Sequence, residues 1–219
     1  LIVFYHKYTV QSRKTELLAV GKDLILYAAC DRISLNGSPC RKEECCMKNE
    51  TLDVINSRRS IRAYKSDAIP RELLNAVLEA GTSAPTGMGR QSPVIIAVES
   101  KAYRDRVSKL NAAVLGSDTD PYYGAPVIIL VLADSSRPTY VEDASCVLEN
   151  MMLAAHSLGL GTVWVHRERE IFDSENGKRL LAEWKLPESL RGVGSIAIGY
   201  PAVEPDARLP RKDGYIIHV

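Results

Sequence analysis

The sequence predicts a domain of the α/β or α+β class, in which helices cover a central sheet in three layers. Two observations predict this fold class. Short apolar segments rich in β-branched residues, typical of buried strands, alternate with longer segments in which apolar residues recur every three or four positions, as on one face of a helix. The length of 219 residues fits one domain, or one domain with an appendage, and allows a large buried core.

The first part of the domain contains two predicted helices. Thr51–Asn56 predicts a short helix that Thr51 could cap, and a short extended piece follows at Ala63–Tyr64. Pro70–Ala80 predicts a stronger helix, because it opens on proline and its leucine and valine residues repeat at i, i+4. Gly81 is expected to end that helix.

The middle of the domain contains a loop, two strands and a helix. Thr82–Ser92 is rich in Gly, Pro, Ser and Thr, which predicts a loop. Val94–Val98 predicts a buried strand, and Lys101–Val114 predicts a helix. Val127–Ala133 is the clearest strand, because its apolar and β-branched residues are continuous, as in a sheet covered on both faces.

The last part of the domain contains the longest predicted helix, Val141–Leu158, which Gly159 is expected to end. Two further strands, Thr162–Val165 and Val193–Ile198, flank a helix around Glu175–Lys185. The alternation of strands and helices therefore extends over the whole domain.

Composition and charge exclude several classes of protein. The chain has 28 Lys and Arg residues against 27 Asp and Glu, a net charge of +1, which argues against a protein-wide electrostatic interaction with nucleic acid or anionic lipid. No apolar run reaches the length of about 20 residues that a bilayer crossing needs. The composition is also too apolar and too balanced in charge for a disordered chain.

The first 46 residues differ from the rest of the chain. They hold four cysteines, Cys30, Cys40, Cys45 and Cys46, and the first methionine is Met47. A metal or cluster module and an export segment are both conceivable. However, the cysteine spacing matches neither a zinc pair nor an iron–sulfur run, and the apolar stretch before Cys30 lacks an adjoining cationic start.

The pattern favours an extension over residues 1–46 that lies outside the catalytic unit, such as upstream sequence read in frame before a start at Met47. The domain then comprises residues 47–219, an ordinary single-domain size. Because it holds one cysteine, Cys146, we expect a cytoplasmic protein.

A compact group of cations and a hydroxyl is the first candidate site. Arg58, Arg59 and Arg62 could give forked, charge-assisted hydrogen bonds to a phosphate, and Ser60 adds a hydroxyl donor. The alternative is a solvated turn whose arginines pair with acids such as Asp53 or Asp67.

The loop SAPTGMGRQSP, Ser83–Pro93, is the second candidate. Its glycines and small residues let backbone N–H groups approach a phosphate, a ribityl chain or a ring edge, although an ordinary helix-to-strand loop is an equal alternative. It is neither a Walker loop nor G-x-G-x-x-G. A basic tail (Arg208, Arg211 and Lys212) becomes relevant if it folds back onto the first arginine group.

Other motifs point to structure rather than chemistry. The glycines of Gly159–Gly161 are typical of a helix end, and His156 on the long helix favours a core or interface role. The sequence has no G-x-S-x-G elbow, no H-E-x-x-H and no close His–Cys signature. No metal site is predicted, and no acid–base pair stands out as catalytic.

Five motifs in order resemble one family. INSRRSIRAY, APTGMGRQSP, YGAPVIILVLA, AAHSLGLGTVWV and a closing IGYP…RLPRK together resemble the short form of the nitroreductase family of FMN-dependent flavoproteins, over about Asn49 to Val219. The resemblance implies an α+β fold of three layers, α/β/α, with a central, mostly antiparallel sheet flanked by helices. It also implies a homodimer with two FMN sites at the subunit interface.

The resemblance implies a cofactor-binding role for several residues. Those that match the contacts to the FMN phosphate and ribityl chain are Arg58, Arg59 and Ser60, with Arg208, Arg211 and Lys212 as candidates for a second phosphate clamp. Those that match contacts to the ring system are Arg62 at the pyrimidine edge, Pro85, Thr86, Gly87 and Gln91 along the isoalloxazine, and Val165 and His166 near N5.

This chain departs from the family pattern at two places in the loop. Gly89 stands where the family usually has Asn, and Ser92-Pro93 stands where a Pro-Trp usually follows the glutamine. The Asn side chain would hydrogen-bond the flavin, so we expect Gly89 either to loosen that contact or to leave it to backbone. These departures affect the identity of the acceptor rather than FMN binding.

The resemblance implies an NAD(P)H-dependent FMN oxidoreductase that works by a ping-pong mechanism. NADH or NADPH would reduce the flavin, and an electrophilic acceptor such as a nitroaromatic or a quinone would then take the electrons, with no catalytic side chain because FMN carries the chemistry. A cation such as Arg62 would stabilise the negative charge of reduced flavin. The alternatives are an FMN-binding carrier or redox sensor without NAD(P)H turnover, a flavin-fragmenting enzyme, and an arginine-rich module without flavin.

Overall fold

The computed structural model describes residues 49–219, and Glu50–Val219 form one compact unit. The predicted extension over residues 1–46 lies outside the described residues. The unit is built on a four-stranded sheet in the order β1-β2-β4-β3, in which every neighbouring pair of strands is antiparallel. The strands are β1 (Pro93–Val98), β2 (Val127–Asp134), β3 (Gly161–Val165) and β4 (Leu190–Gly199).

The central strand β2 shows why the sheet is covered on both faces. Ile129 and Val131 pack into one hydrophobic cluster, whereas Ile128, Leu130 and Leu132 pack into a second cluster on the other face. Because successive side chains of a strand point to opposite faces, a continuous apolar run satisfies both cores. The prediction of a strand buried on both sides is confirmed.

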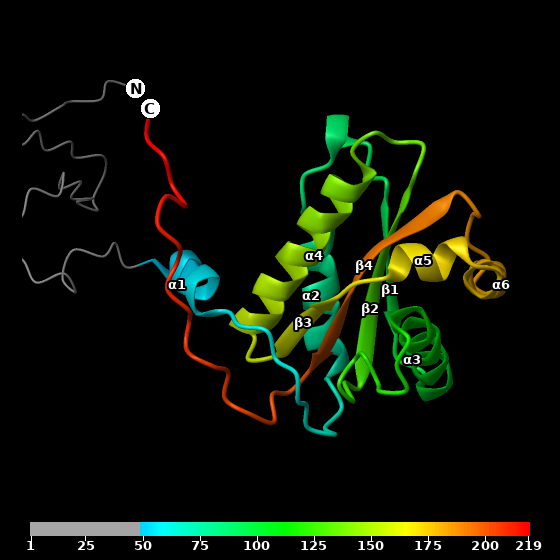
Figure 1. Ribbon diagram of the computed structural model, residues 1–219, viewed down its shortest axis with the longest axis horizontal. Helices are drawn as coiled ribbons and strands as arrows, with labels where there is room; N and C mark the ends of the chain where they lie inside the picture. The colour runs from blue at the N-terminus through cyan, green and yellow to red at the C-terminus, as the bar shows by residue number, and fades with distance from the viewer. Residues whose placement is uncertain (1–48) are drawn as a thin grey trace, which may run out of the picture. The chain divides into compact units, whose positions relative to one another are not determined.

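Helices form the two outer layers (Figure 1). On one face lie α2 (Arg71–Thr82) and α4 (Tyr140–Ser157), whose buried residues join the first cluster. On the other lie α3 (Lys101–Leu115), α5 (Glu168–Asp173) and α6 (Glu175–Glu183), which contribute to the second. The predicted three-layer α+β fold with an antiparallel sheet is therefore confirmed.

Two predictions about the helices are wrong, and one helix was not predicted. Gly81 does not end α2 but lies inside it, because a Cβ there would come within 2.8 Å of Met151 Cγ, so a glycine lets α2 approach α4. Thr51 lies within the first turn of α1 (Glu50–Ser57) rather than capping it. The helix α5, six residues long, had no counterpart among the predicted elements.

The segment after α1 joins the edge of the sheet. Ser60 forms a parallel bridge with Thr162 of β3, and the Ile61 N–H donates to the Thr162 carbonyl at 2.9 Å. Gly161 permits this approach, because a Cβ there would lie 2.8 Å from the Ile61 side chain. Within residues 49–219 no helix has the length and apolar character of a bilayer span.

Candidate functional site

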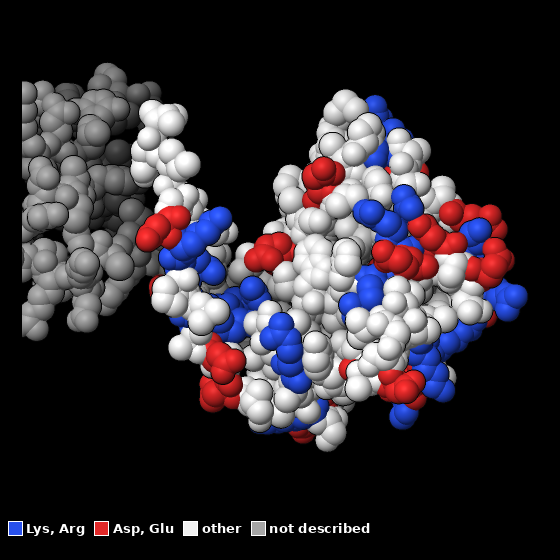
Figure 2. Space-filling view, in the orientation of Figure 1, with Lys and Arg blue, Asp and Glu red and all other residues white. Residues whose placement is uncertain are grey.

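A cavity of about 440 Å³ opens between the segment after α1, the α4–β3 turn and the chain beyond β4. Its lining includes the cations Arg58, Arg59 and Lys65, together with His156 and one carboxylate, Glu204. Figure 2 shows basic side chains gathered near α1 and the start of the C-terminal tail. Because Ser60 pairs with β3, the arginines that precede it are held at this cavity. The cavity is thus a preformed, positively charged concavity.

Two polar atoms of the cavity-lining residues have no partner among the described residues. Arg58 Nη1 and Thr162 Oγ1 are both buried and make no hydrogen bond. Burying such groups unpaired costs free energy, so they suit a ligand that supplies acceptors. In the described part of the chain, no ion pair joins Arg58 or Arg59 to Asp53 or Asp67, as a solvated turn would require.

Arg59 has a partly structural role. Its Nη1 donates to the carbonyls of Asn56 at 2.8 Å and Arg58 at 2.6 Å, at the C-terminal end of α1. A guanidinium has five N–H groups, so other donors of Arg59 remain available to the cavity it lines. Arg62, in contrast, is exposed and does not line the cavity.

The loop Ser83–Pro93 lies at the other end of α4, near its first turn. Asp143, in that first turn, is buried and accepts hydrogen bonds from the Gly87 N–H at 2.9 Å and from the Ser92 hydroxyl at 3.4 Å. Thr139 also donates to Asp143, at 3.3 Å, and a Cβ at Gly87 would lie only 2.3 Å from the Thr139 hydroxyl oxygen. One buried carboxylate and one glycine therefore set the shape of the loop.

The tip of the loop is exposed and has unusual backbone geometry. Met88, Gly89 and Gln91 all have positive φ, at 53°, 64° and 52°. Met88 is 87% exposed, and Pro85 is also exposed. Thr86 Oγ1 accepts from the Gln91 N–H at 3.0 Å, which closes the turn. Hydrogen bonds within the loop fix its conformation, and its tip is exposed to solvent.

The cavity and the loop do not come together within one chain. Asp143 and His156 stand thirteen positions apart on α4, which corresponds to about 20 Å along a helix. Figure 1 shows the same arrangement, with the short turn η1 (Gly87–Gly89) near the start of α4 and α1 near its end. The two groups of predicted flavin contacts thus occupy opposite ends of the helix.

The end of β3 holds the third predicted group. Val165 is buried, and its carbonyl accepts from Ser195 Oγ at 3.3 Å, whereas His166 is exposed and its carbonyl accepts from Asn111 Nδ2 at 2.9 Å. Arg167 follows with φ of +89°, and its Nε donates to Asn111 Oδ1 at 2.8 Å. A strained residue is therefore anchored directly after His166.

A buried acid lies behind this turn. Glu168 is fully buried, and its Oε1 accepts from Ser195 at 2.5 Å, Tyr122 at 2.9 Å and Asn111 at 3.2 Å, while Oε2 has no partner among the described residues. Burial raises the pKa of Glu168 to about 7, although the donated hydrogen bonds oppose that rise. Sequence reasoning missed Glu168, since only tertiary burial distinguishes it from the exposed Glu170.

The basic tail returns to α1 through one residue. Arg208 Nη1 donates to Asn56 Oδ1 at 3.0 Å, two positions before Arg58. Arg211 and Lys212 are exposed and do not line the cavity, and Lys212 lies over the Tyr215 ring at 5.9 Å. Lys65 and His156, which do line it, were not among the predicted site residues. Among residues 49–219 no group of three or more metal-ligating side chains gathers.

The domain matches known proteins over most of its length. A model of the nitroreductase family matches residues 55–200. A relative from Methanothermobacter thermautotrophicus, whose name assigns it provisionally to the NADH dehydrogenases and NAD(P)H nitroreductases, is 32% identical over 74% of this chain and 82% of its own length. An FMN reductase of Bacillus subtilis is 28% identical over 74% of this chain and 70% of its own.

Solved structures share the fold. A nitroreductase from Bacteroides fragilis with bound FMN superposes with a TM-score of 0.73 at 31% identity, and the match covers 78% of this chain and all of that one. A nitroreductase from Desulfitobacterium hafniense, also with bound FMN, has a TM-score of 0.71 at 28% identity over 79% of this chain and all of that one.

Proposed function

The chain belongs to the nitroreductase family, and we propose on that basis that it is an FMN-dependent oxidoreductase that passes electrons from NAD(P)H to an electrophilic small molecule. The observation that carries this proposal is the cavity in which a buried arginine nitrogen and a buried threonine hydroxyl have no partner within residues 49–219. Nitroaromatics and quinones are the acceptors that we expect.

The donor set of the cavity fits the phosphate of FMN. Arg58, Arg59 and Lys65 supply positive charge, and Thr162 supplies a hydroxyl. A phosphate monoester carries a charge of about −1.5 to −2 at neutral pH and offers three acceptor oxygens. It would pair Arg58 Nη1 and Thr162 Oγ1, so these residues would hold the cofactor by its phosphate. Ser60 pairs with Thr162 through its backbone but is exposed and does not line the cavity, so its predicted contact with the cofactor stays a prediction.

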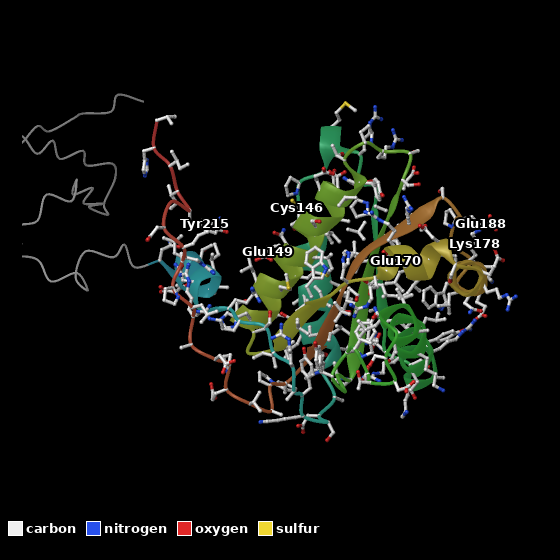
Figure 3. The ribbon with its side chains drawn as sticks, viewed as in Figure 1. Cys146, Glu149, Glu170, Lys178, Glu188 and Tyr215 are labelled. Atoms are coloured by element: carbon white, nitrogen blue, oxygen red, sulfur yellow. The ribbon has the colours of Figure 1, made fainter. Side chains whose placement is uncertain are left out.

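The loop would serve the flavin ring of a second copy. Because Gly87 and the cavity lie at opposite ends of α4, one chain does not surround a cofactor with both. A homodimer that brings the loop of one chain to the cavity of its partner would do so. Exposed apolar side chains on α1, Leu52 and Ile55, and an adjoining groove lined by Leu153 of α4 support such an interface. Cys146 and Glu149 lie on the outer side of α4 (Figure 3).

When bound, FMN would supply the redox chemistry by which electrons pass from NAD(P)H to the acceptor. The chain's own residues would bind FMN and orient its ring. The anchored turn at His166 and Arg167 would hold the end of β3 in place beside the ring, and the exposed Arg62 would place positive charge near its pyrimidine edge. The loop around Gly87 would exclude water from the ring face.

The absorption spectrum of the purified full-length chain tests this proposal, followed by anaerobic stopped-flow mixing with NADH or NADPH. We expect flavin bands in the near-ultraviolet and blue that bleach on mixing. A colourless protein that does not take up added FMN would overturn the proposal in favour of a module without flavin. Flavin bands that neither nucleotide bleaches would overturn the reductase activity and leave a carrier or sensor.

A further inference from the structure

His156 is a titratable residue of the cavity whose role the proposed function leaves open. It lies in the last turn of α4, is partly buried, and lines the cavity together with Arg58 and Arg59. Its Nε2 lies 2.8 Å from Ser57 Oγ, and Ser57 Oγ in turn lies 2.6 Å from the Asp53 carbonyl. The ring is therefore fixed by α1 rather than free to rotate away.

The charges around His156 are mainly positive. Arg58, Arg59 and Lys65 line the same cavity, against one carboxylate, Glu204, from the chain beyond β4. On α1, the acidic side chains are Glu50, which lines a neighbouring groove with Ser157, and Asp53. The last carbonyls of α4 itself favour a cation at its end.

Burial and the charges of Arg58 and Arg59 lower the pKa of His156, in that order of importance. The ring is then largely neutral at pH 7 while the arginines are uncompensated. An anion with close to two negative charges offsets most of the positive charge of Arg58, Arg59 and Lys65, and so favours the protonated ring. Proton binding and anion binding at this cavity are thus linked.

We propose that His156 takes up a proton from solvent when the phosphate monoester of FMN enters this cavity, and that it thereby contributes to the preference for FMN over riboflavin. The inference rests on the proposed function, because it takes FMN as the ligand. The protonated ring still donates Nε2–H to Ser57, whose hydroxyl donates to the main-chain carbonyl of Asp53, so that the proton is gained without reorientation of the ring.

Calorimetric titration of the FMN-free full-length chain with FMN tests the proposal. The titration is run at pH 7 in two phosphate-free buffers that differ in ionisation enthalpy, and the difference in heat counts the protons exchanged. The phosphate of FMN itself titrates near pH 6, so the informative quantity is the difference between the unmodified chain and His156→Gln. Riboflavin, which lacks the phosphate, is the matched ligand control.

We expect the unmodified chain to take up more protons per FMN than His156→Gln, and His156→Gln to bind FMN about threefold to tenfold more weakly at pH 7. Riboflavin should show neither difference. Equal proton uptake by the two proteins, with FMN still bound, would overturn this inference alone, whereas failure of both to bind FMN would overturn the proposed function as well. Should His156→Gln not fold, the NMR titration of the histidines of the unmodified chain decides, since the inference requires one of them to gain a higher pKa with FMN but not with riboflavin.

Discussion

The two ends of α4 differ in how completely one chain builds them. At the C-terminal end, the pairing of Ser60 with Thr162 on the edge strand fixes one wall of the cavity. Two buried polar atoms of its lining residues, Arg58 Nη1 and Thr162 Oγ1, have no partner among the described residues. At the N-terminal end, the loop is fixed by the hydrogen bond that the Gly87 N–H donates to Asp143, and its tip at Met88 is exposed. Under the proposed function, one chain would supply a phosphate cavity and, about 20 Å away, a ring-binding loop for another copy.

The largest expected effect is on the cavity. Arg58→Ala removes the guanidinium whose Nη1 is buried, and charge-assisted hydrogen bonds of this kind are worth about 1.5 to 3 kcal/mol, so FMN affinity should fall by about tenfold to a hundredfold. Quenching of flavin fluorescence on titration measures the affinity. Arg169→Ala, an exposed arginine on α5, is the matched control and should bind FMN as the unmodified chain does. Unchanged FMN affinity in Arg58→Ala would remove Arg58 from the phosphate site.

A smaller effect is expected at the loop end. Asp143→Ala leaves the Gly87 N–H without its acceptor, and an unsatisfied buried group costs about 1 to 3 kcal/mol in the free energy of unfolding. Urea denaturation measures the loss, and limited proteolysis should show earlier cleavage within residues 83–93. Glu142→Ala, at the exposed neighbouring position, is the control. If both variants were equally stable, the loop would not depend on Asp143.

The smallest effect concerns the acid behind β3. Because the pKa of Glu168 is raised to about 7 in the folded protein, the folded state binds more protons than the unfolded state between about pH 4.5 and 7. This contribution to stability is therefore fully present below about pH 4.5, falls by on the order of 1 kcal/mol per pH unit as the pH rises from about 4.5 to 7, and levels off above 7. Urea denaturation at several pH values measures the slope.

Glu168→Gln carries the neutral amide and should flatten that slope, whereas Glu170→Gln, at an exposed position of α5 (Figure 3), should leave it unchanged. A slope that persists in Glu168→Gln would assign the pH dependence to another group. The result would also show whether the anchored turn that follows β3 depends on a protonated acid.

The sequence predicted those helices and strands whose apolar residues follow a clear local pattern. The strand around Leu130 has a continuous apolar run, and the long helix around Met151 has a clear helical repeat of apolar residues. Both patterns are strong enough to predict the element without knowledge of the tertiary structure. The prediction that Gly81 ends α2 was wrong because its role depends on tertiary packing. The glycine lets α2 approach α4. The six residues of α5 are too few for a helical period to emerge.

The sequence predicted individual residues of the candidate site, but not how the fold arranges them relative to one another. The cations around Arg58 and the glycines around Gly87 are conspicuous in sequence. Lys65, Asp143 and Glu168 are not, because their importance lies in burial and in what they face across the fold. The separation of the two candidate regions along α4 likewise follows from packing, which no spacing in the sequence encodes.

Mixed dimers of two variants test the central claim that two copies complete each FMN site. Arg58→Ala disables the cavity, and Gly87→Leu disables the loop, because a side chain there collides with Thr139. Neither variant alone should bind FMN tightly. Coexpressed with separate tags and purified as the hybrid, they should recover one FMN per two chains at the affinity of the unmodified protein, since one of the two sites then has an intact cavity and an intact loop. A hybrid that binds no better than its parents would contradict the claim.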